Sequence, residues 1–125
     1  MPHLIIVMAG GAIGAGLRFL LGRWTLHQFG PAFPWGTLTA NIVGGLAMGI
    51  LVGMLARFGS GAEGWRLFLG VGILGGFTTF SAFSLETMNM IERGDFGLAG
   101  AYALISVVAS VLALFIGLWL VRVAA

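Results

Sequence analysis

Hydroxyl and amide side chains recur at helical spacing in a chain that is otherwise apolar. Thr37 and Asn41 are four residues apart, and Tyr102, Ser106 and Ser110 repeat every four residues. Residues at this spacing lie on one face of a helix. Such groups are costly in lipid, so each should face the interior of a helix bundle or a pore. The spacing predicts two polar tracks, which serve either ion passage or hydrogen bonding between packed helices.

Two phenylalanines follow a glycine-rich segment in the second half of the chain. Phe80 and Phe83 are three residues apart and share a face where that segment is helical. The edge of a phenyl ring carries partial positive charge, so two edges turned into a narrow pore would favour an anion without binding it tightly. Packing against neighbouring helices is the alternative use of these rings.

Ionisable side chains within the apolar stretches are few. Arg18 either finds a polar partner at depth or extends its long side chain to the membrane surface. Glu86 is the candidate acid for a second kind of protein, a small proton-coupled exporter, although it lies late in its apolar stretch. The chain has no Cys, and its sequence offers no nucleophile beside a base, no carboxylate pair and no metal-ligand cluster. We therefore predict that it is not an enzyme.

Composition places these residues in a membrane. Of 125 residues, 59% are hydrophobic and 8% are charged, against about 25% charged residues in a soluble domain. The excess of base is six Arg over four acids, scattered rather than clustered, so we expect no nucleic-acid partner. The apolar N-terminus is not a typical signal peptide, because Arg18 and Arg23 follow the apolar run instead of preceding it.

Four apolar stretches are long enough to cross a bilayer. They run approximately over residues 3–25, 35–58, 65–91 and 96–124, and the connectors at 30–34, 59–64 and 92–95 are rich in Gly, Pro and polar residues. All four Trp fall near the ends of these stretches, where the headgroup boundary favours them. We predict an all-α integral membrane protein, a single domain over residues 1–125 with four antiparallel transmembrane helices.

Arginine near the span ends carries the signal for orientation. Arg57, Arg66 and Arg122 belong to the side of the termini, and the other three arginines belong to the opposite side. Because orientation follows the Lys and Arg bias, a tally of three against three predicts dual topology, with copies inserted in both directions. The alternative is that Arg18 lies too deep to count, which would place the termini inside.

Glycine predicts how the spans pack. Gly10 and Gly14, like the Gly45, Gly49 and Gly53 stripe, recur at four-residue spacing and permit close helix contact. The third span differs, because Gly75 and Gly76 come just before Phe77, Thr78 and Thr79. We expect the helix to break near residues 75–79 and to free backbone carbonyls that can hold a small cation. A simple kink satisfied by the Thr hydroxyls is the alternative.

Three motifs in these spans resemble a known family. They are Gly10-Gly11-x-x-Gly14-Ala15-x-x-Arg18, then Asn41-x-x-Gly44, then Gly75-Gly76-Phe77-Thr78-Thr79-Phe80-Ser81-x-Phe83. In this order they resemble the motifs of the Fluc fluoride channels, also called CrcB proteins. Two positions depart from the family pattern: Phe19 stands where Tyr is usual, and Ala82 stands where Thr is usual.

The resemblance implies a fluoride-selective channel that exports fluoride passively across a prokaryotic inner membrane. It implies an antiparallel, dual-topology homodimer with two pores, each built from both subunits. Residues that would line the fluoride pathway are Phe80, Phe83, Asn41, Tyr102, Ser106, Ser110 and Thr79. Arg18 would line an electropositive vestibule, and the backbone carbonyls of Gly75 and Thr78 would hold a structural Na+ at the dimer centre. A non-conducting assembly subunit is a further alternative, which explains the glycine stripes but not the polar tracks.

Overall fold

The fold is all-helical over the residues that the structure describes. The computed structural model describes residues 2–58 and 63–124. Its elements are α1 (Pro2–Phe29), α2 (Trp35–Phe58), α3 (Glu63–Trp65), η2 (Arg66–Leu74), α4 (Gly75–Phe77), α5 (Ser81–Glu92) and α6 (Phe96–Ala124). α3, η2, α4 and α5 form one interrupted span, in which η2 is a nine-residue π-helix. Within this part of the chain there are four helical segments long and apolar enough to cross a membrane, as predicted.

The predicted span boundaries agree closely with the observed ones. The second and fourth predicted spans, 35–58 and 96–124, coincide with α2 and α6. The first span is longer than predicted and ends at Phe29, where Gly30 takes a φ of +77° and turns the chain. Gly94, with a φ of +85°, turns the connector before α6 in the same way. Of the predicted connector 59–64, residues 59–62 lie outside the described residues.

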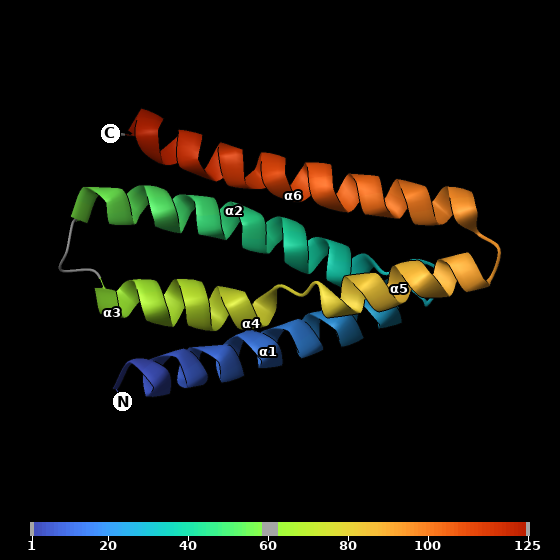
Figure 1. Cartoon of the computed structure of the whole chain (residues 1–125), viewed down its shortest axis with the longest axis horizontal. Coiled ribbons are helices and arrows are strands. Elements are labelled where there is room, and N and C mark those ends of the chain that lie inside the picture. The colour runs from blue at the N-terminus through green and yellow to red at the C-terminus, as the bar shows by residue number, and fades with distance from the viewer. Residues whose placement is uncertain (1, 59–62, 125) are drawn as a thin grey trace.

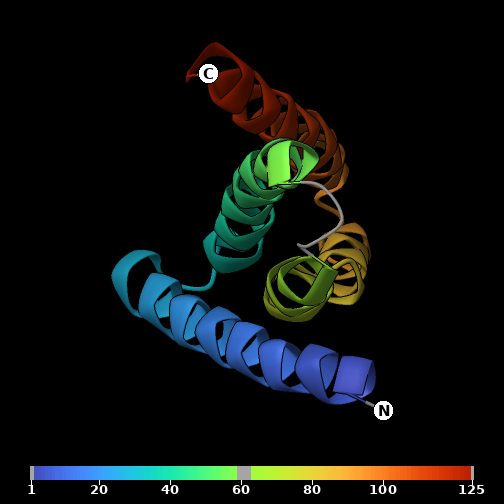
Figure 2. The same cartoon turned by 90° about the vertical axis from the view of Figure 1, so that its left-hand side faces the viewer.

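The spans alternate in direction, so both ends of the chain lie at the same end of the bundle (Figure 1). Viewed along the bundle, α2 lies between α1 and α6, and the interrupted third span lies beside all three (Figure 2). α2 packs along α6, whereas η2 and α4 pack on α1. α5, the second half of the third span, packs on α6 instead. The third span therefore changes its neighbour at the point where it is interrupted.

Backbone contact explains the glycine stripes. A methyl group on Gly10 would lie 2.5 Å from the Phe68 carbonyl oxygen, and one on Gly76 would lie 2.5 Å from the Gly11 carbonyl oxygen. Between α2 and α6, a methyl group on Gly45 would lie 2.6 Å from the carbonyl oxygen of Ser110. These helices approach more closely than any larger residue allows, which is the contact that small residues provide in lipid.

The third span is interrupted over residues 78–80. This segment is shorter than the predicted one, residues 75–79, and lies at the C-terminal end of that prediction. Gly75 is helical, with φ −62° and ψ −38°, and α4 continues to Phe77. The chain leaves the helix at Thr78, where ψ is 157°, and α5 begins at Ser81. Both glycines of the pair are helical, so the helix does not break at glycine. Gly76 instead allows close contact with α1. We refer to residues 78–80 as the break.

Candidate functional site

The break is held by a side chain from another span. Asn41 of α2 accepts a hydrogen bond from the Thr79 backbone N–H at its Oδ1 (3.0 Å) and donates from Nδ2 to the Thr79 carbonyl oxygen (3.2 Å). A backbone N–H can only donate, so this pairing also identifies which atom of the Asn41 amide is oxygen. The second N–H of the Asn41 amide remains available for another acceptor.

The hydroxyl groups of Thr78 and Thr79 form hydrogen bonds with backbone groups on either side of the break. Thr78 Oγ1 donates to the Leu74 carbonyl oxygen (2.9 Å). A Thr hydroxyl therefore does satisfy one backbone group, which is one feature expected of a simple kink. The Ala82 N–H donates to Thr79 Oγ1 (3.2 Å), which caps the start of α5. The interruption is thus a full loss of helix over residues 78–80 and not a bend in a continuous one.

A cavity of about 450 Å³ opens beside the break, between α2, α5 and α6. We call it the central groove. It brings together most of the residues predicted to line the ion pathway: Asn41, Thr79, Phe80, Phe83, Ser106 and Ser110. Thr78 lines it as well. Spacing had selected all of these side chains except Thr79, which the family resemblance supplied, and they meet in space although they come from three different spans.

The hydroxyl groups of Ser106 and Ser110 are buried in the central groove without a partner. Neither Oγ forms a hydrogen bond with another polar atom of the described residues. An unpaired buried hydroxyl costs free energy and therefore needs an explanation. Interhelical hydrogen bonding, the alternative use of this track, is not formed at these two positions.

The two phenylalanines line the groove side by side. The ring centroids of Phe80 and Phe83 are 5.5 Å apart, with the ring planes tilted by 47°. Phe80 is 76% exposed, more than any other large apolar side chain of the described residues. Phe83 is half-buried and also packs on Tyr102, at 5.2 Å between centroids.

Tyr102 does not line the central groove, because it is fully buried and points to Glu86. Its hydroxyl donates to Glu86 Oε1 (3.0 Å), and the Thr37 hydroxyl donates to Glu86 Oε2 (2.9 Å). The Glu86 carboxylate is therefore held by one residue from α2 and one from α6. Residue spacing does not predict these partners of Glu86, because both donors lie far from it along the chain.

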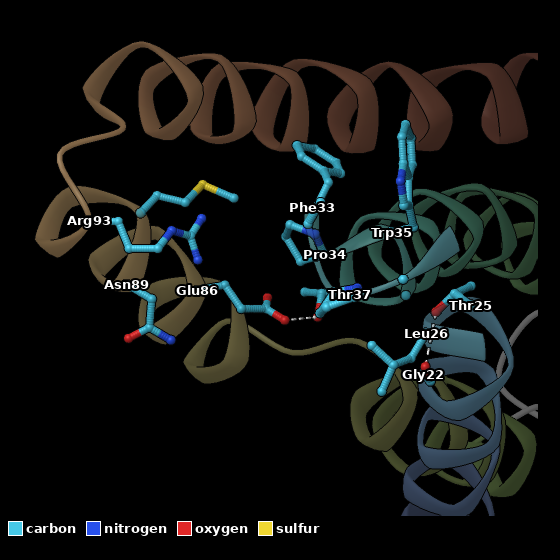
Figure 3. A pocket seen from close by; sticks show the side chains of 15 residues that line it. Gly22, Thr25, Leu26, Phe33, Pro34, Trp35, Thr37, Glu86, Asn89 and Arg93 are labelled. Atoms are coloured by element: carbon cyan, nitrogen blue, oxygen red, sulfur yellow. Dashed lines mark hydrogen bonds between the residues drawn. The ribbon is translucent and has the colours of Figure 1, made fainter. Parts of the chain in front are cut away.

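Glu86 and Thr37 line a second cavity, of about 320 Å³, which we call the mouth pocket. Figure 3 shows its walls: the connector from α1 to α2 supplies Phe33, and α5 supplies Glu86 and Asn89. Arg93, directly after α5, lines it as well. The dashed line between Glu86 and Thr37 marks the hydrogen bond that the Thr37 hydroxyl donates (Figure 3).

Both polar tracks begin at Glu86 and lead to the central groove. Thr37 bonds to Glu86, and Asn41 lies one turn further along α2 in the groove. Tyr102 bonds to Glu86 in the same way, and Ser106 and Ser110 follow on α6 in the groove. Polar groups thus continue from the mouth pocket to the middle of the bundle.

Arg18 lies apart from both cavities. Its Nε donates a long hydrogen bond to the Gly76 carbonyl oxygen (3.4 Å), so the arginine has a polar partner at depth, one of the two possibilities that its position left open. It lines neither the central groove nor the mouth pocket. Its role in a vestibule stays a prediction.

Together, the four apolar spans and the polar tracks enclosed between them define a multi-pass membrane protein of the helical-bundle class. The particular family follows from comparison with known proteins. The family model described as "CrcB-like protein, Camphor Resistance (CrcB)" matches residues 5–118. The chain belongs to the CrcB family, which confirms the resemblance seen in its motifs.

Several relatives that share one name can be aligned with nearly the whole chain. Proteins named fluoride-specific ion channel FluC are 57% identical over 122 residues in Sphingopyxis alaskensis and 58% identical over 123 residues in Phenylobacterium zucineum. Each of these alignments covers 98% of this chain and 97% of the relative. The FluC of Novosphingobium aromaticivorans is 58% identical over 124 residues, 98% of each chain. Ion channels are not enzymes, so the prediction that this chain is not an enzyme is confirmed.

Proposed function

We propose that this protein is a fluoride-selective channel that lets fluoride leave the cell passively across the inner membrane. The observation that carries the proposal is the continuity of the polar tracks from Glu86 into the central groove, where the Ser106 and Ser110 hydroxyls are buried without partners. The names of its relatives support fluoride as the ion.

Fluoride is small and strongly hydrated, so it must exchange water for donors that hold it weakly. The groove offers three kinds of donor: the unpaired hydroxyls, the second N–H of Asn41, and the ring edges of Phe80 and Phe83. Ring edges attract an anion through the quadrupole without a full charge, which favours passage over tight binding.

The functional unit in this proposal is an antiparallel homodimer with dual topology and two pores. Exposure at the break supports a partner, because Phe80 and Gly75 are exposed on the single chain at mid-span, beside backbone that lipid does not solvate. The arginine tally of three against three supports insertion in both directions. A second copy would cover the central groove and contribute its own residues to each pore.

A structural Na+ at the dimer centre is part of the proposal. The residues fit such an ion, since Thr78 leaves the helical conformation and its carbonyl is directed out of the helix. Backbone carbonyls are suitable ligands for a small hard cation. The carbonyls of Gly75 and Thr78 from both subunits would hold the ion.

Efflux from liposomes tests the channel directly. Liposomes that contain the purified protein and are loaded with fluoride should lose fluoride rapidly with no proton gradient present. The same liposomes loaded with chloride should lose chloride far more slowly. Release that requires a proton gradient would instead identify an exporter that uses Glu86. No release, or equal chloride release, would contradict the channel.

Phe80→Ile tests the role of the ring edges. The branched aliphatic side chain has no positive edge, so we expect fluoride efflux to be abolished while the dimer remains intact on size-exclusion chromatography. Phe115→Ile is the matched control, since Phe115 is also exposed (61%) but lines neither cavity. Normal efflux through Phe80→Ile would show that the ring has no part in conduction.

A further inference from the structure

Two backbone N–H groups, one in the break and one in the first turn of α5, do not bond to the carbonyls that a continuous helix would offer them. In a continuous α-helix each N–H donates to the carbonyl four residues earlier, so the Thr79 N–H would bond to Gly75 and the Ala82 N–H to Thr78. Here the Thr79 N–H donates to Asn41 Oδ1 (3.0 Å), and the Ala82 N–H donates to Thr79 Oγ1 (3.2 Å). The carbonyls of Gly75 and Thr78 therefore lack the partners that a continuous helix would provide.

We propose that Asn41 and Thr79 are positioning residues for the central cation, because their side chains free the two carbonyls that would bind it. The inference rests on the structural Na+ of the proposed function. Each of these side chains would then have a second role besides contact with fluoride. Asn41 Oδ1 and Thr79 Oγ1 each accept an N–H that in a continuous helix would bond to one of the carbonyls proposed to bind the cation.

Asn41 also determines the direction of the Thr78 carbonyl. The Thr78 carbonyl and the Thr79 N–H belong to one peptide group, and the described residues contain no cis peptide. In a trans peptide these two groups point in opposite directions. Since the Thr79 N–H points at Asn41, the Thr78 carbonyl points away from Asn41. The second bond, from Asn41 Nδ2 to the Thr79 carbonyl, fixes the next peptide group as well.

Gly44, one turn after Asn41 on α2, holds the other side of Thr78. A methyl group on Gly44 would collide with Thr78 Cγ2, whereas its contacts with Phe77 Cδ2 and Thr78 Cβ, both at 3.7 Å, would be ordinary. The absence of a side chain at Gly44 thus lets Thr78 lie against α2 in the orientation that Asn41 selects. Thr78→Ser would remove the colliding methyl group and keep the hydroxyl that bonds to Leu74.

Thermal unfolding in the presence of Na+ tests the proposal. A cation that binds only the folded dimer raises its Tm with concentration. The unfolding of purified dimer is followed at constant protein concentration and constant chloride, with NaCl replaced stepwise by choline chloride. We expect the wild-type Tm to rise with Na+. Thr79→Val removes the acceptor with little change in shape, and Thr79→Ser is the matched control that keeps it.

In Thr79→Val the Ala82 N–H is free to bond to the Thr78 carbonyl, so Na+ must compete with that bond. The Na+ concentration for half-maximal stabilisation should rise about tenfold, which corresponds to one hydrogen bond of about 1.4 kcal/mol. Thr79→Ser should stay within about twofold of the wild type, because the accepting oxygen is retained. A Tm that falls equally in both salts, with unchanged Na+ dependence, would show a merely structural role and overturn the proposal.

A second pair of variants decides the matter if Thr79→Val does not fold. Gly44→Ala should weaken the Na+ dependence or prevent folding, and Gly44→Ala combined with Thr78→Ser should regain a Na+-dependent Tm. Wild-type Na+ dependence in Gly44→Ala, or no recovery in the double variant, would overturn the proposal. A wild-type Tm that is indifferent to Na+ would remove the cation and this inference together, while fluoride efflux in liposomes would still report on the channel separately.

Discussion

Replacing Gly14 by Ala should separate α1 from the first half of the third span. A methyl group there would lie 2.8 Å from the Phe77 backbone nitrogen and closer still to the Ile73 carbonyl oxygen. Both are backbone atoms within helices, so no side-chain rotation can relieve the contact. Overpacking of this kind costs about 3 kcal/mol at the upper end of its range. The higher helix propensity of Ala recovers about 1 kcal/mol of this.

The net loss is therefore about 2 kcal/mol, or roughly a thirtyfold fall in the ratio of folded to unfolded protein. Gly16→Ala is the control two residues away, where a methyl group would meet nothing within 4 Å. It should leave the protein unchanged or more stable by about 0.5–1 kcal/mol, since it gains helix propensity without a collision.

Equilibrium unfolding in mixed micelles of a mild detergent and SDS measures both variants, with circular dichroism reporting helix content. Protein concentration must be equal in all samples, because the stability of the proposed dimer would depend on it. Gly14→Ala should unfold at a lower SDS fraction than the wild type, and Gly16→Ala should not. Equal midpoints for the two variants would refute the close contact of α1 with the residues just before the break.

Two further predictions concern the polar tracks. Tyr102→Phe should destabilise the folded protein by about 0.5–3 kcal/mol, the range for a hydrogen bond to a neutral or charged group, and a double-mutant cycle with Glu86→Met, which removes the accepting oxygens, should return most of that as coupling. Coupling near zero in the SDS assay would contradict the bond. Ser110→Ala should slow fluoride efflux several-fold yet change unfolding by less than about 0.5 kcal/mol, because the hydroxyl has no partner in the chain. A large loss of stability with normal efflux would assign that hydroxyl to packing.

The span boundaries were predictable because the bilayer itself determines them. A helix needs about 20 apolar residues to cross, and few other constraints act on where it begins and ends. This is why the predicted spans 35–58 and 96–124 coincide with α2 and α6. The polar tracks were predictable for the same reason, since lipid excludes hydroxyl and amide groups from the outer face of a helix.

The site of the break was not predictable at the same precision, because its cause lies outside the third span. Gly75 and Gly76 suggested a break at the glycine pair, but glycine only permits other conformations and does not impose them. The observed break at residues 78–80 depends on Asn41, whose side chain bonds to Thr79 across 38 positions of sequence. The partners of Glu86 were missed for a similar reason, since Thr37 lies 49 positions and Tyr102 16 positions away.

The exposed backbone at the break supports the proposal that the functional unit contains a second copy of the chain. Lipid cannot hydrogen-bond to free backbone groups, and each one left unsatisfied in hydrocarbon costs several kcal/mol. The carbonyl of Gly75 has lost its helical donor to Asn41, and this residue is exposed on the single chain. Phe80, beside it, is 76% exposed although Phe83 is half-buried. An exposed phenyl ring is compatible with lipid, but the backbone next to it is not. Protein, water or an ion must therefore cover the break, and the second copy and central cation proposed above would do so.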